Sequence, residues 1–395
     1  MIYDFDEIID RRGTYAEKYE ELEKLYGRAD AIPLWVADMD FKAAQPVVDA
    51  IRKRTENGVF GYTTRPDSYY DAVCSFQKKR KNWNIEKKLM SFGIGVVPSI
   101  CMLVRELTQP GDRIIIQTPV YRPFFNAVTD ASRELVENPL KDVDGQYYMD
   151  FEDLEEKVKQ GAKFLILCNP HNPVGRVWTR KELEALGDLC VKYGIKVISD
   201  EIHSDLILWE KTHIPFETIS EEVRKLTITC IAASKTFNLA GLQSSVVVFP
   251  DAKTKSTFDR AWARLHVECN NCLSLVGTQA AYEHGEEWLE QLIKYIEGNV
   301  NSVLEYMGKF IPVIKPLRPE GTYLIWLDCR QLGMSGKQLV DFMVNEAGVA
   351  MSAGTYFGKN GEGYMRMNVA CPRATVEKAL EQIRAAVERR GLTGI

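Results

Sequence analysis

The middle of the chain alternates short apolar runs with amphipathic helical patterns, and this alternation constrains the fold more than any other feature. Apolar runs of about five residues that are rich in β-branched side chains predict buried strands. They cover residues 113–117, 163–168, 195–199, 226–231 and 244–249. Strands separated by helices form βαβ units, which build a mainly parallel sheet with helices on both faces. The sequence therefore predicts an α/β fold.

Local signals locate several of the intervening helices. Asp150 precedes the helical pattern of residues 151–160 and is a suitable N-cap. Thr179 is followed three residues later by a glutamate, which is the signature of a capping box for a helix over residues 179–193. Residues 94–107 predict a loop that turns into a helix.

The last third of the chain has a different pattern, with longer helices and one clear strand. The helices are predicted at 288–310, 335–346 and 374–390, and the strand at 322–328. This pattern predicts a second, smaller α/β domain. We expect residues 46–284 to form the large domain, and residues 1–45 together with residues 285–395 to form the small one.

Charge and cysteine content exclude several classes of function. Fifty basic and fifty-five acidic residues give a net charge of −5, which argues against a general attraction to nucleic acid or to an anionic membrane. The chain starts without a signal-peptide pattern, and apolar runs such as residues 246–250 are far too short to span a bilayer. The nine cysteines are an odd number and widely spaced, which predicts reduced thiols in a cytoplasmic protein.

Metal and dinucleotide sites have no convincing sequence signal. Cys269 and Cys272 have the spacing of a redox or zinc pair, but no second such pair exists, so we expect packed thiols. Gly93 and Gly95 lack the third glycine of a dinucleotide-binding loop. We therefore expect no metal and a small-molecule ligand of another kind.

Polar residues follow three of the predicted strands, where α/β sheets bind their ligands. Residues 169–175 contain two Asn-Pro pairs, Asp200 follows the next strand, and Ser234 with Lys235 follows a third. A lysine near buried apolar surface loses part of its proton affinity, which suits an amine that bonds covalently to a ligand. A buried aspartate requires a positive partner, and a pyridinium nitrogen would serve.

Each of these residues also has a structural interpretation when it is taken singly. Lys235 could be a solvated loop residue, and Asp200 a helix N-cap or a turn acceptor. The Asn-Pro pairs could form a plain turn, although proline also fixes the backbone that orients an asparagine amide. The order of the motifs along the chain decides between the two interpretations.

That order resembles the fold-type I pyridoxal-phosphate (PLP) enzymes of aminotransferase class I/II. The motifs are Asn-Pro-x-Asn-Pro-x-Gly at 169–175, Ser-Asp-Glu at 199–201 and Ser-Lys-Thr-Phe at 234–237. Further motifs narrow the resemblance to the MalY/PatB-type C–S β-lyases, the group of cystathionine β-lyase and cystalysin. They lie at residues 33–41, 58–63, 117–125 and 168–178.

The resemblance implies a role for each matching residue around PLP. Lys235 is implied to bind the cofactor covalently and to move the substrate proton, and Asp200 to keep the pyridine nitrogen protonated. Asn172 is implied to bond the phenolic oxygen of the cofactor and to border the substrate. Tyr121 is implied to stack on the ring and to take part in catalysis. Arg366 matches the arginine that binds the substrate α-carboxylate in a bidentate manner.

The phosphate group is expected at a helix start and at the dimer interface. The family's phosphate loop matches Gly95, Val96 and Val97, where backbone N–H groups open a helix. Ser234 is a further phosphate contact in this interpretation. Tyr62 matches the tyrosine that the family lends to the phosphate of the partner subunit, which implies a homodimer with shared active sites.

The chain departs from many aminotransferases at three positions near the motifs. Gln243 stands where an arginine often binds the phosphate, and Ala232 where some relatives have a serine. His203 stands where a tyrosine often follows the aspartate; it is either a cofactor-binding residue or a packed one. Gln243 and His203 agree with the lyase group and weaken an assignment as an ordinary transaminase.

The resemblance implies a PLP-dependent C–S β-lyase that cleaves cystathionine or S-substituted cysteines to a thiol, pyruvate and ammonia. An aminotransferase acting on a small or aromatic amino acid is the alternative, because the same residues generate the carbanion in both reactions. An additional regulatory role that involves binding another protein is a minor alternative, for which the sequence contains no specific motif.

Overall fold

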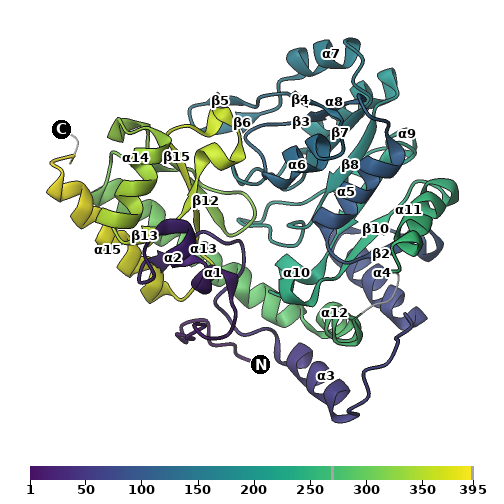
Figure 1. The fold of residues 1–395 in the computed structure, drawn as a ribbon, viewed down its shortest axis with the longest axis horizontal. Coiled ribbons are helices and arrows are strands. Elements are labelled where there is room, and N and C mark those ends of the chain that lie inside the picture. The colour runs from purple at the N-terminus through teal and green to yellow at the C-terminus, as the bar shows by residue number, and fades with distance from the viewer. Residues whose placement is uncertain (268–270, 393–395) are drawn as a thin grey trace.

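The computed structural model describes residues 1–267 and 271–392, and its centre is a sheet of seven strands (Figure 1). In spatial order the strands are β2 (Met90–Gly93), β10 (Ser245–Val248), β9 (Thr227–Ile231), β8 (Lys196–Asp200), β7 (Phe164–Cys168), β3 (Arg113–Ile116) and β4 (Glu134–Glu137). Neighbours from β9 to β4 are parallel, and β10 is antiparallel to both of its neighbours. The predicted α/β fold with a mainly parallel sheet is confirmed, and β2 and β4 are strands that the sequence pattern did not reveal.

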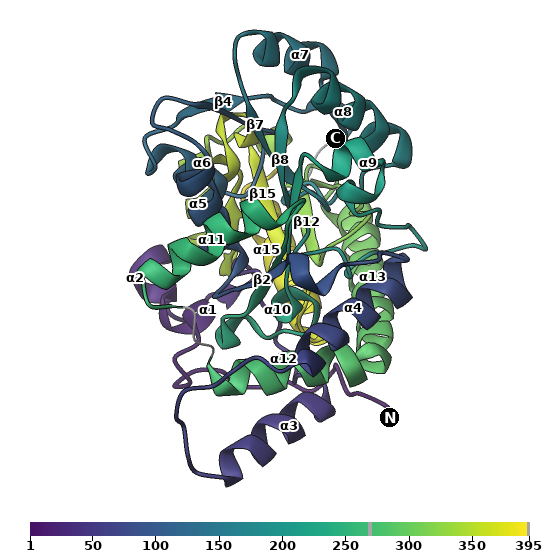
Figure 2. The same ribbon diagram turned by 90° about the vertical axis from the view of Figure 1, so that its right-hand side faces the viewer.

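Helices cover both faces of this sheet, as Figure 2 shows. On one face lie α5 (Val96–Leu107), α6 (Pro123–Thr129) and α11 (Ala252–Arg264). On the other face lie α7 (Phe151–Lys159), α8 (Arg180–Tyr193) and α9 (Glu221–Arg224). Helices α4 (Asp67–Lys81) and α12 (Cys272–His284) also lie on this face. Successive strand residues point to opposite faces, so Ile166 packs with the first group and Leu165 and Leu167 with the second.

Both predicted helix starts have the expected caps. The Asp150 carboxylate accepts a hydrogen bond from the backbone N–H of Asp153 at 3.2 Å. Thr179 and Glu182 form both hydrogen bonds of the capping box. These caps satisfy backbone N–H groups that have no partner inside the helix.

A second sheet of four antiparallel strands is built from the C-terminal third of the chain. Its strands in order are β11 (Lys315–Pro316), β12 (Leu324–Asp328), β15 (Tyr364–Asn368) and β14 (Ser352–Ala353). The long helices α13 (Glu286–Phe310) and α15 (Arg373–Arg389) contribute their apolar faces to the same core. The predicted helix over 335–346 is wrong in part, because α14 ends at Asp341 and residues 342–346 continue as a wider π-helical turn.

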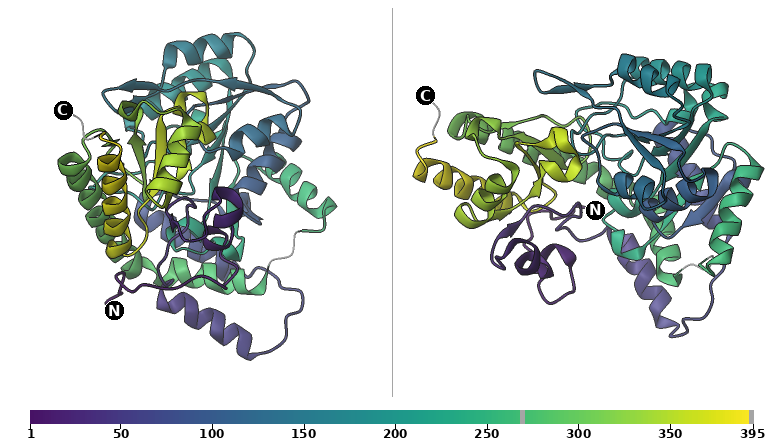
Figure 3. Two further views of the ribbon diagram at one scale, coloured as in Figure 1. Left: turned by 60° about the vertical axis from the view of Figure 1, so that its left-hand side comes forward. Right: turned by 45° about the horizontal axis from the view of Figure 1, so that its top comes forward.

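The N-terminal segment runs beside these C-terminal elements (Figure 3). Strand β1 (Ile32–Pro33) pairs in parallel with β13 (Val349–Ala350). The remaining elements are α1 (Glu17–Glu20), α2 (Leu22–Tyr26), α3 (Gln45–Glu56), α10 (Ala233–Thr236), β5 (Lys141–Val143), β6 (Gln146–Tyr148) and α14 (Gly336–Asp341).

A buried ion cluster fixes the segment of residues 33–41 that leads from β1 toward the large sheet. Lys18 is fully buried, and its Nζ atom lies 2.7 Å from Asp40 Oδ2. Arg11 binds Asp38 and Asp40, each at 2.7 Å. Charges removed from water are tolerated only when they are paired in this way, so the cluster holds Asp38 and Asp40 in one arrangement.

We expect Lys18→Ala to lower the free energy of unfolding by about 3 kcal/mol, because it removes one partner from a buried ion cluster. Lys24→Ala is the control: it breaks the exposed pair with Glu21 and should cost less than about 1 kcal/mol. Urea unfolding followed by circular dichroism measures both variants. Equal losses in the two variants would contradict the assigned role of Lys18.

Candidate functional site

A cavity of about 200 Å³ lies at the carboxyl ends of the central strands. Nine of the eleven residues that the resemblance assigns to cofactor or substrate binding line it. The nine are Gly95, Val96, Val97, Tyr121, Asn172, Asp200, His203, Ser234 and Lys235. Arg366 does not line the cavity itself, but it donates a hydrogen bond to Asn172, which does. Tyr62 lies outside the cavity.

The sheet explains why residues so far apart in sequence meet here. Cys168, the last residue of β7, is paired with Asp200 at the end of β8, and Asp200 is paired with Cys230 on β9. Because the three strands are parallel and in register, the segments that follow them emerge at one edge. Asn172 follows β7 and Lys235 follows β9, so both reach the same cavity.

A glycine turn opens helix α5 at the cavity. Gly95 has a φ of 150°, in a region that L side chains rarely adopt, and it immediately precedes Val96 at the helix start. The first N–H groups of an α-helix have no partner within the helix. This corner of the cavity can therefore receive an anionic group such as a phosphate.

Lys235 has an amine of reduced basicity. Its Nζ atom donates a hydrogen bond to the carbonyl oxygen of Ala37 at 2.6 Å. Burial lowers the pKa of Lys235 to about 8, the nearby Arg366 charge acts in the same direction, and the carboxylates of Asp38 and Asp200 oppose it. A substantial fraction of the amine is thus unprotonated near neutral pH, as a nucleophile or a base requires.

Asp200 is a buried carboxyl group that lacks a cationic hydrogen-bond partner in the described part of the chain. Its Oδ1 atom accepts a backbone N–H bond from Ile202 at 3.1 Å. Burial raises the pKa of Asp200 to about 7, and the Glu201 charge contributes. The carboxylate would be stabilised by a ligand that presents a positively charged N–H, so the site fits a pyridinium ring.

Arg366, on β15, is a buried cation that only neutral groups hold. Its guanidinium donates to Asn172 Oδ1 at 3.1 Å, to the Trp35 carbonyl at 2.8 Å and to Ser352 Oγ at 3.2 Å. It also lies over the Phe357 ring, 4.8 Å from the ring centre. Its Nε atom has no partner, and no carboxylate of residues 1–267 or 271–392 pairs with it. This arrangement is suited to a ligand carboxylate.

His203 and Tyr121 complete the buried part of the cavity. Burial lowers the pKa of His203 to about 3, so its ring is neutral, and its Nδ1 atom has no hydrogen-bond partner. The His203 ring packs edge-on against Tyr323 with ring centres 6.0 Å apart. Burial raises the pKa of Tyr121 to about 12, which keeps its hydroxyl protonated. Gln243 also lines the cavity, with a φ of 51°.

Tyr62 lies in a fully exposed position between α3 and α4. Its neighbours Val59 and Phe60 are also more than half exposed. Three large apolar side chains on one short segment form an unusual surface for a chain on its own.

Sequence reasoning missed the contributions of residues 35–38 and of Tyr323. The motif at 33–41 served only as a family marker, although Trp35 and Ala37 supply the carbonyl groups that bind Arg366 and Lys235. Backbone acceptors leave no residue-type signal, so no sequence pattern would have identified them.

The family model of aminotransferase class I and II matches residues 29–383. The chain belongs to this family. Cystathionine beta-lyase PatB of Bacillus subtilis is 41% identical over 384 residues, which cover 97% of this chain and 99% of PatB. Protein MalY of Escherichia coli is 31% identical, with 96% and 97% covered.

Solved structures of the family have nearly the same fold. Cystalysin from Treponema denticola, which contains PLP, superposes with a TM-score of 0.96 at 35% identity and covers 99% of this chain and 100% of cystalysin. A PLP-bound C–S lyase from Staphylococcus hominis gives a TM-score of 0.90 at 36% identity, with 98% of each chain covered.

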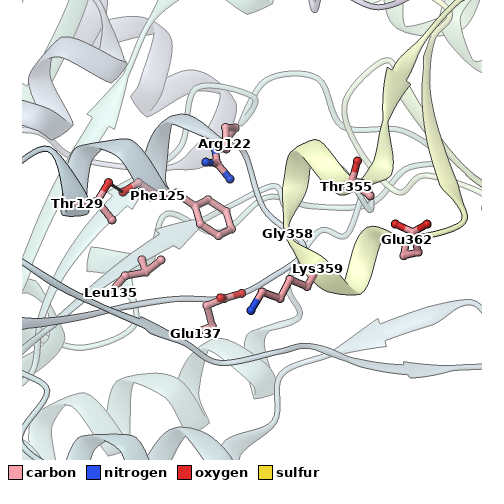
Figure 4. A pocket seen from close by; sticks show the side chains of 9 residues that line it. All are labelled: Arg122, Phe125, Thr129, Leu135, Glu137, Thr355, Gly358, Lys359 and Glu362. Atoms are coloured by element: carbon pink, nitrogen blue, oxygen red, sulfur yellow. Dashed lines mark hydrogen bonds between the residues drawn. The ribbon is translucent and has the colours of Figure 1, made fainter. Parts of the chain in front are cut away.

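A second cavity of about 560 Å³ lies between α6 with β4 on one side and the turns that connect β14 to β15 on the other (Figure 4). It is lined by Arg122, Phe125, Thr129, Leu135, Glu137, Thr355, Gly358, Lys359 and Glu362. The two cavities share no lining residue, and none of the sequence-predicted site residues lines the second one.

Metal and membrane features are absent from the described ranges. No cluster of three or more His, Cys, Asp or Glu side chains there could hold a metal ion. No helix within these ranges is long and apolar enough to cross a membrane. Cys269, half of the Cys-x-x-Cys pair, lies outside the described residues.

We expect Asp200→Asn to flatten the pH dependence of stability of the ligand-free protein. The raised pKa means that the native state binds a proton more tightly than the unfolded chain between about pH 4 and pH 7. The free energy of unfolding therefore falls as pH rises through this range. One pKa unit corresponds to about 1.4 kcal/mol. The difference in the free energy of unfolding between variant and parent should therefore change by roughly 3 kcal/mol from pH 5 to pH 8.

Urea unfolding at several pH values measures this change. Asp49→Asn, a substitution at an exposed position, serves as the control. Its free energy of unfolding should change with pH as that of the parent does. A parallel curve for Asp200→Asn would show that burial does not raise this pKa.

Proposed function

We propose that the chain is a PLP-dependent carbon–sulfur β-lyase that cleaves cystathionine or S-substituted cysteines to a thiol, pyruvate and ammonia. The observation that carries the proposal is the arrangement of three ionisable groups around one cavity. Lys235 has a lowered pKa, Asp200 has no cationic hydrogen-bond partner among the described residues, and Arg366 has an unpartnered donor. The similarity to PatB and to cystalysin supports the same activity.

The residues present fit PLP at each of its polar groups. Lys235 would bind the aldehyde carbon covalently, and Asp200 would hold the proton on the pyridine nitrogen. Backbone N–H groups of residues 95–97 and the Ser234 hydroxyl would bind the phosphate. Asn172 would bond the phenolic oxygen. When bound, PLP supplies a ring that accepts the negative charge left at the substrate α-carbon.

Tyr121 and His203 border the ring position from the remaining sides. Tyr121 would stack on the ring, since it lines the same cavity as Asn172. His203, which is neutral, would offer a hydrogen bond to the cofactor rather than a charge.

Arg366 and Lys235 then act on the substrate itself. Arg366 orients the amino acid by binding its α-carboxylate, which desolvates the carboxylate inside the cavity. The Lys235 amine removes the α-proton, because a pKa of about 8 leaves part of the amine unprotonated at neutral pH. The C–S bond then breaks with its electron pair on sulfur. A thiolate, whose parent thiol has a pKa near 8.5, needs little assistance from an acid.

The proposed PLP site also implies what each domain and each subunit contributes to it. Residues 46–284 would hold PLP, while residues 1–45 and 285–395 would supply Arg366 and the Ala37 carbonyl. The exposed Tyr62 would reach the phosphate of a second copy, which makes the enzyme a homodimer with shared sites. An amino-acid substrate and a cytoplasmic location complete the proposal.

An aminotransferase is the second candidate, because the family model that matches the chain covers that reaction class. Lys235, Asp200 and Arg366 would serve both reactions up to removal of the α-proton. The two differ only in whether a proton returns to the cofactor carbon or the β-substituent leaves.

The first test is product formation without an added keto acid. We expect the enzyme to release thiol and pyruvate from cystathionine, measured with a thiol reagent and lactate dehydrogenase. Lys235→Ala should lower kcat by at least about a thousandfold and should prevent borohydride from fixing PLP to the protein. The exposed control Lys24→Ala should behave as the parent. Strict dependence on a keto acid would instead select the aminotransferase.

The second test concerns the shared site. We expect Tyr62→Phe to weaken PLP retention by about tenfold, because it removes one hydrogen bond to a charged group. Equilibrium dialysis against PLP measures this effect, and Tyr15→Phe, at another exposed tyrosine, is the control. Unchanged retention in Tyr62→Phe would argue against a contact with the partner's phosphate.

A further inference from the structure

One backbone carbonyl receives two donors beside the Lys235 amine. The oxygen of Ala37 accepts Lys235 Nζ at 2.6 Å and the Tyr323 hydroxyl at 2.8 Å. A carbonyl oxygen has two lone pairs, so these two donors saturate it. Any group that fixes this carbonyl therefore also fixes the position of the free amine.

Asn368 fixes the backbone on either side of that carbonyl. Its side-chain nitrogen donates to the carbonyls of Val36 and Asp38, each at 2.6 Å, and its oxygen accepts the N–H of Ala370 at 2.7 Å. Asn368 is almost completely buried at the end of β15. With both neighbouring carbonyls held, the peptide of Ala37 has little freedom to rotate.

Tyr323 is fixed in turn by an uncommon backbone conformation. Thr322 has a φ of 70°, which is rare for a β-branched residue and persists only where the surroundings impose it. Its N–H donates to the Leu206 carbonyl at 2.7 Å, and its hydroxyl accepts the N–H of Leu324 at 3.1 Å. Tyr323 itself is fully buried, so its hydroxyl is directed at Ala37.

We propose that Tyr323 and Asn368 are positioning residues of this enzyme, which hold the Ala37 carbonyl as the docking point of the Lys235 amine whenever that amine is free. The proposal rests on the proposed function, in which Lys235 takes the α-proton. A hydrogen bond from the amine to Ala37 restrains the position of the nitrogen, so the flexible lysine side chain stays within the cavity and close to the site of proton transfer.

The Tyr323 hydroxyl also tunes the amine. It withdraws electron density from the Ala37 oxygen, which weakens that oxygen as an acceptor for the charged ammonium. Removing the hydroxyl should therefore favour the protonated form. The other charged or titratable groups that act on this amine or line the same cavity include Glu17, Asp38, Tyr121, Cys168, Asp200, His203 and Arg366.

The experiment compares Tyr323→Phe and Asn368→Ala with the parent as full-length proteins. For Tyr323→Phe in the PLP-loaded enzyme we expect about a tenfold fall in kcat, a change in KM of less than twofold, and an acid limb of the kcat profile shifted to higher pH. In the ligand-free protein, the rate at which acetic anhydride modifies Lys235, followed by peptide mass spectrometry, should rise at a correspondingly higher pH. Asn368→Ala should lower kcat by at least as much.

Tyr147→Phe is the matched control, since Tyr147 is a buried tyrosine whose hydroxyl accepts a bond from Trp326 Nε1 at 3.2 Å. Tyr147→Phe loses the hydroxyl's buried hydrogen bonds with Trp326 and Tyr364, away from Lys235, and should leave both pH profiles unchanged.

A Tyr323→Phe protein with the parent's kcat profile and Lys235 reactivity would overturn the proposal, as would identical shifts in Tyr147→Phe. If Asn368→Ala does not fold, Tyr323→Phe decides alone. The modification experiment needs no lyase activity, so a chain that releases no thiol but shows the shifted Lys235 reactivity would refute the proposed function and retain the docking point.

Discussion

Removal of ionisable groups from water at the carboxyl edge of the parallel sheet is the constraint on which the site depends. Asp200 ends a strand whose neighbours are both parallel to it, so its side chain lies at the carboxyl edge of the sheet, where it lines the cavity and is almost completely buried. Lys235 reaches the same place from the next strand. Burial is the largest cause of both pKa shifts, upward for the acid and downward for the amine.

The two shifts have a common consequence for ligand binding. Each residue is driven toward its neutral form, while their mutual attraction only partly restores the charges. A ligand that brings a positive N–H to Asp200 and an aldehyde to Lys235 relieves both penalties at once. Arg366 differs, because even a pKa lowered to about 10 leaves it charged at neutral pH. In the proposed enzyme, the attraction for a substrate carboxylate would therefore come from one buried cation and not from the mildly acidic chain as a whole.

The sequence predicted the features that residue type and periodicity encode. Strand β7 and the capping box of α8 follow from apolar runs and from Thr179 with its glutamate partner, and the structure has both. Five of the nine predicted residues that line the cavity lie within the motifs whose order indicated the family: Tyr121, Asn172, Asp200, Ser234 and Lys235. Gly95, Val96, Val97 and His203 lie outside those motifs and were assigned by their match to the family. Short strands such as β2 were missed because four residues beside a glycine turn give little periodicity. The helix predicted over 335–346 changes its winding at Phe342, and residue types do not encode that change.

The residues that hold the site together could not be predicted, because they act through backbone carbonyls of one segment. The carbonyls of Trp35 and Ala37 bind the two site cations, Arg366 and Lys235, whereas those of Val36 and Asp38 bind Asn368. Along this segment, the carbonyls that bind Arg366 or Lys235 therefore alternate with the carbonyls that bind Asn368. The distance between the cations is set by two residues of main chain, and this chain segment is in turn held by buried ion pairs of Asp38 and Asp40. Substitutions at these ion pairs, remote from the reacting atoms, would therefore move both cations together.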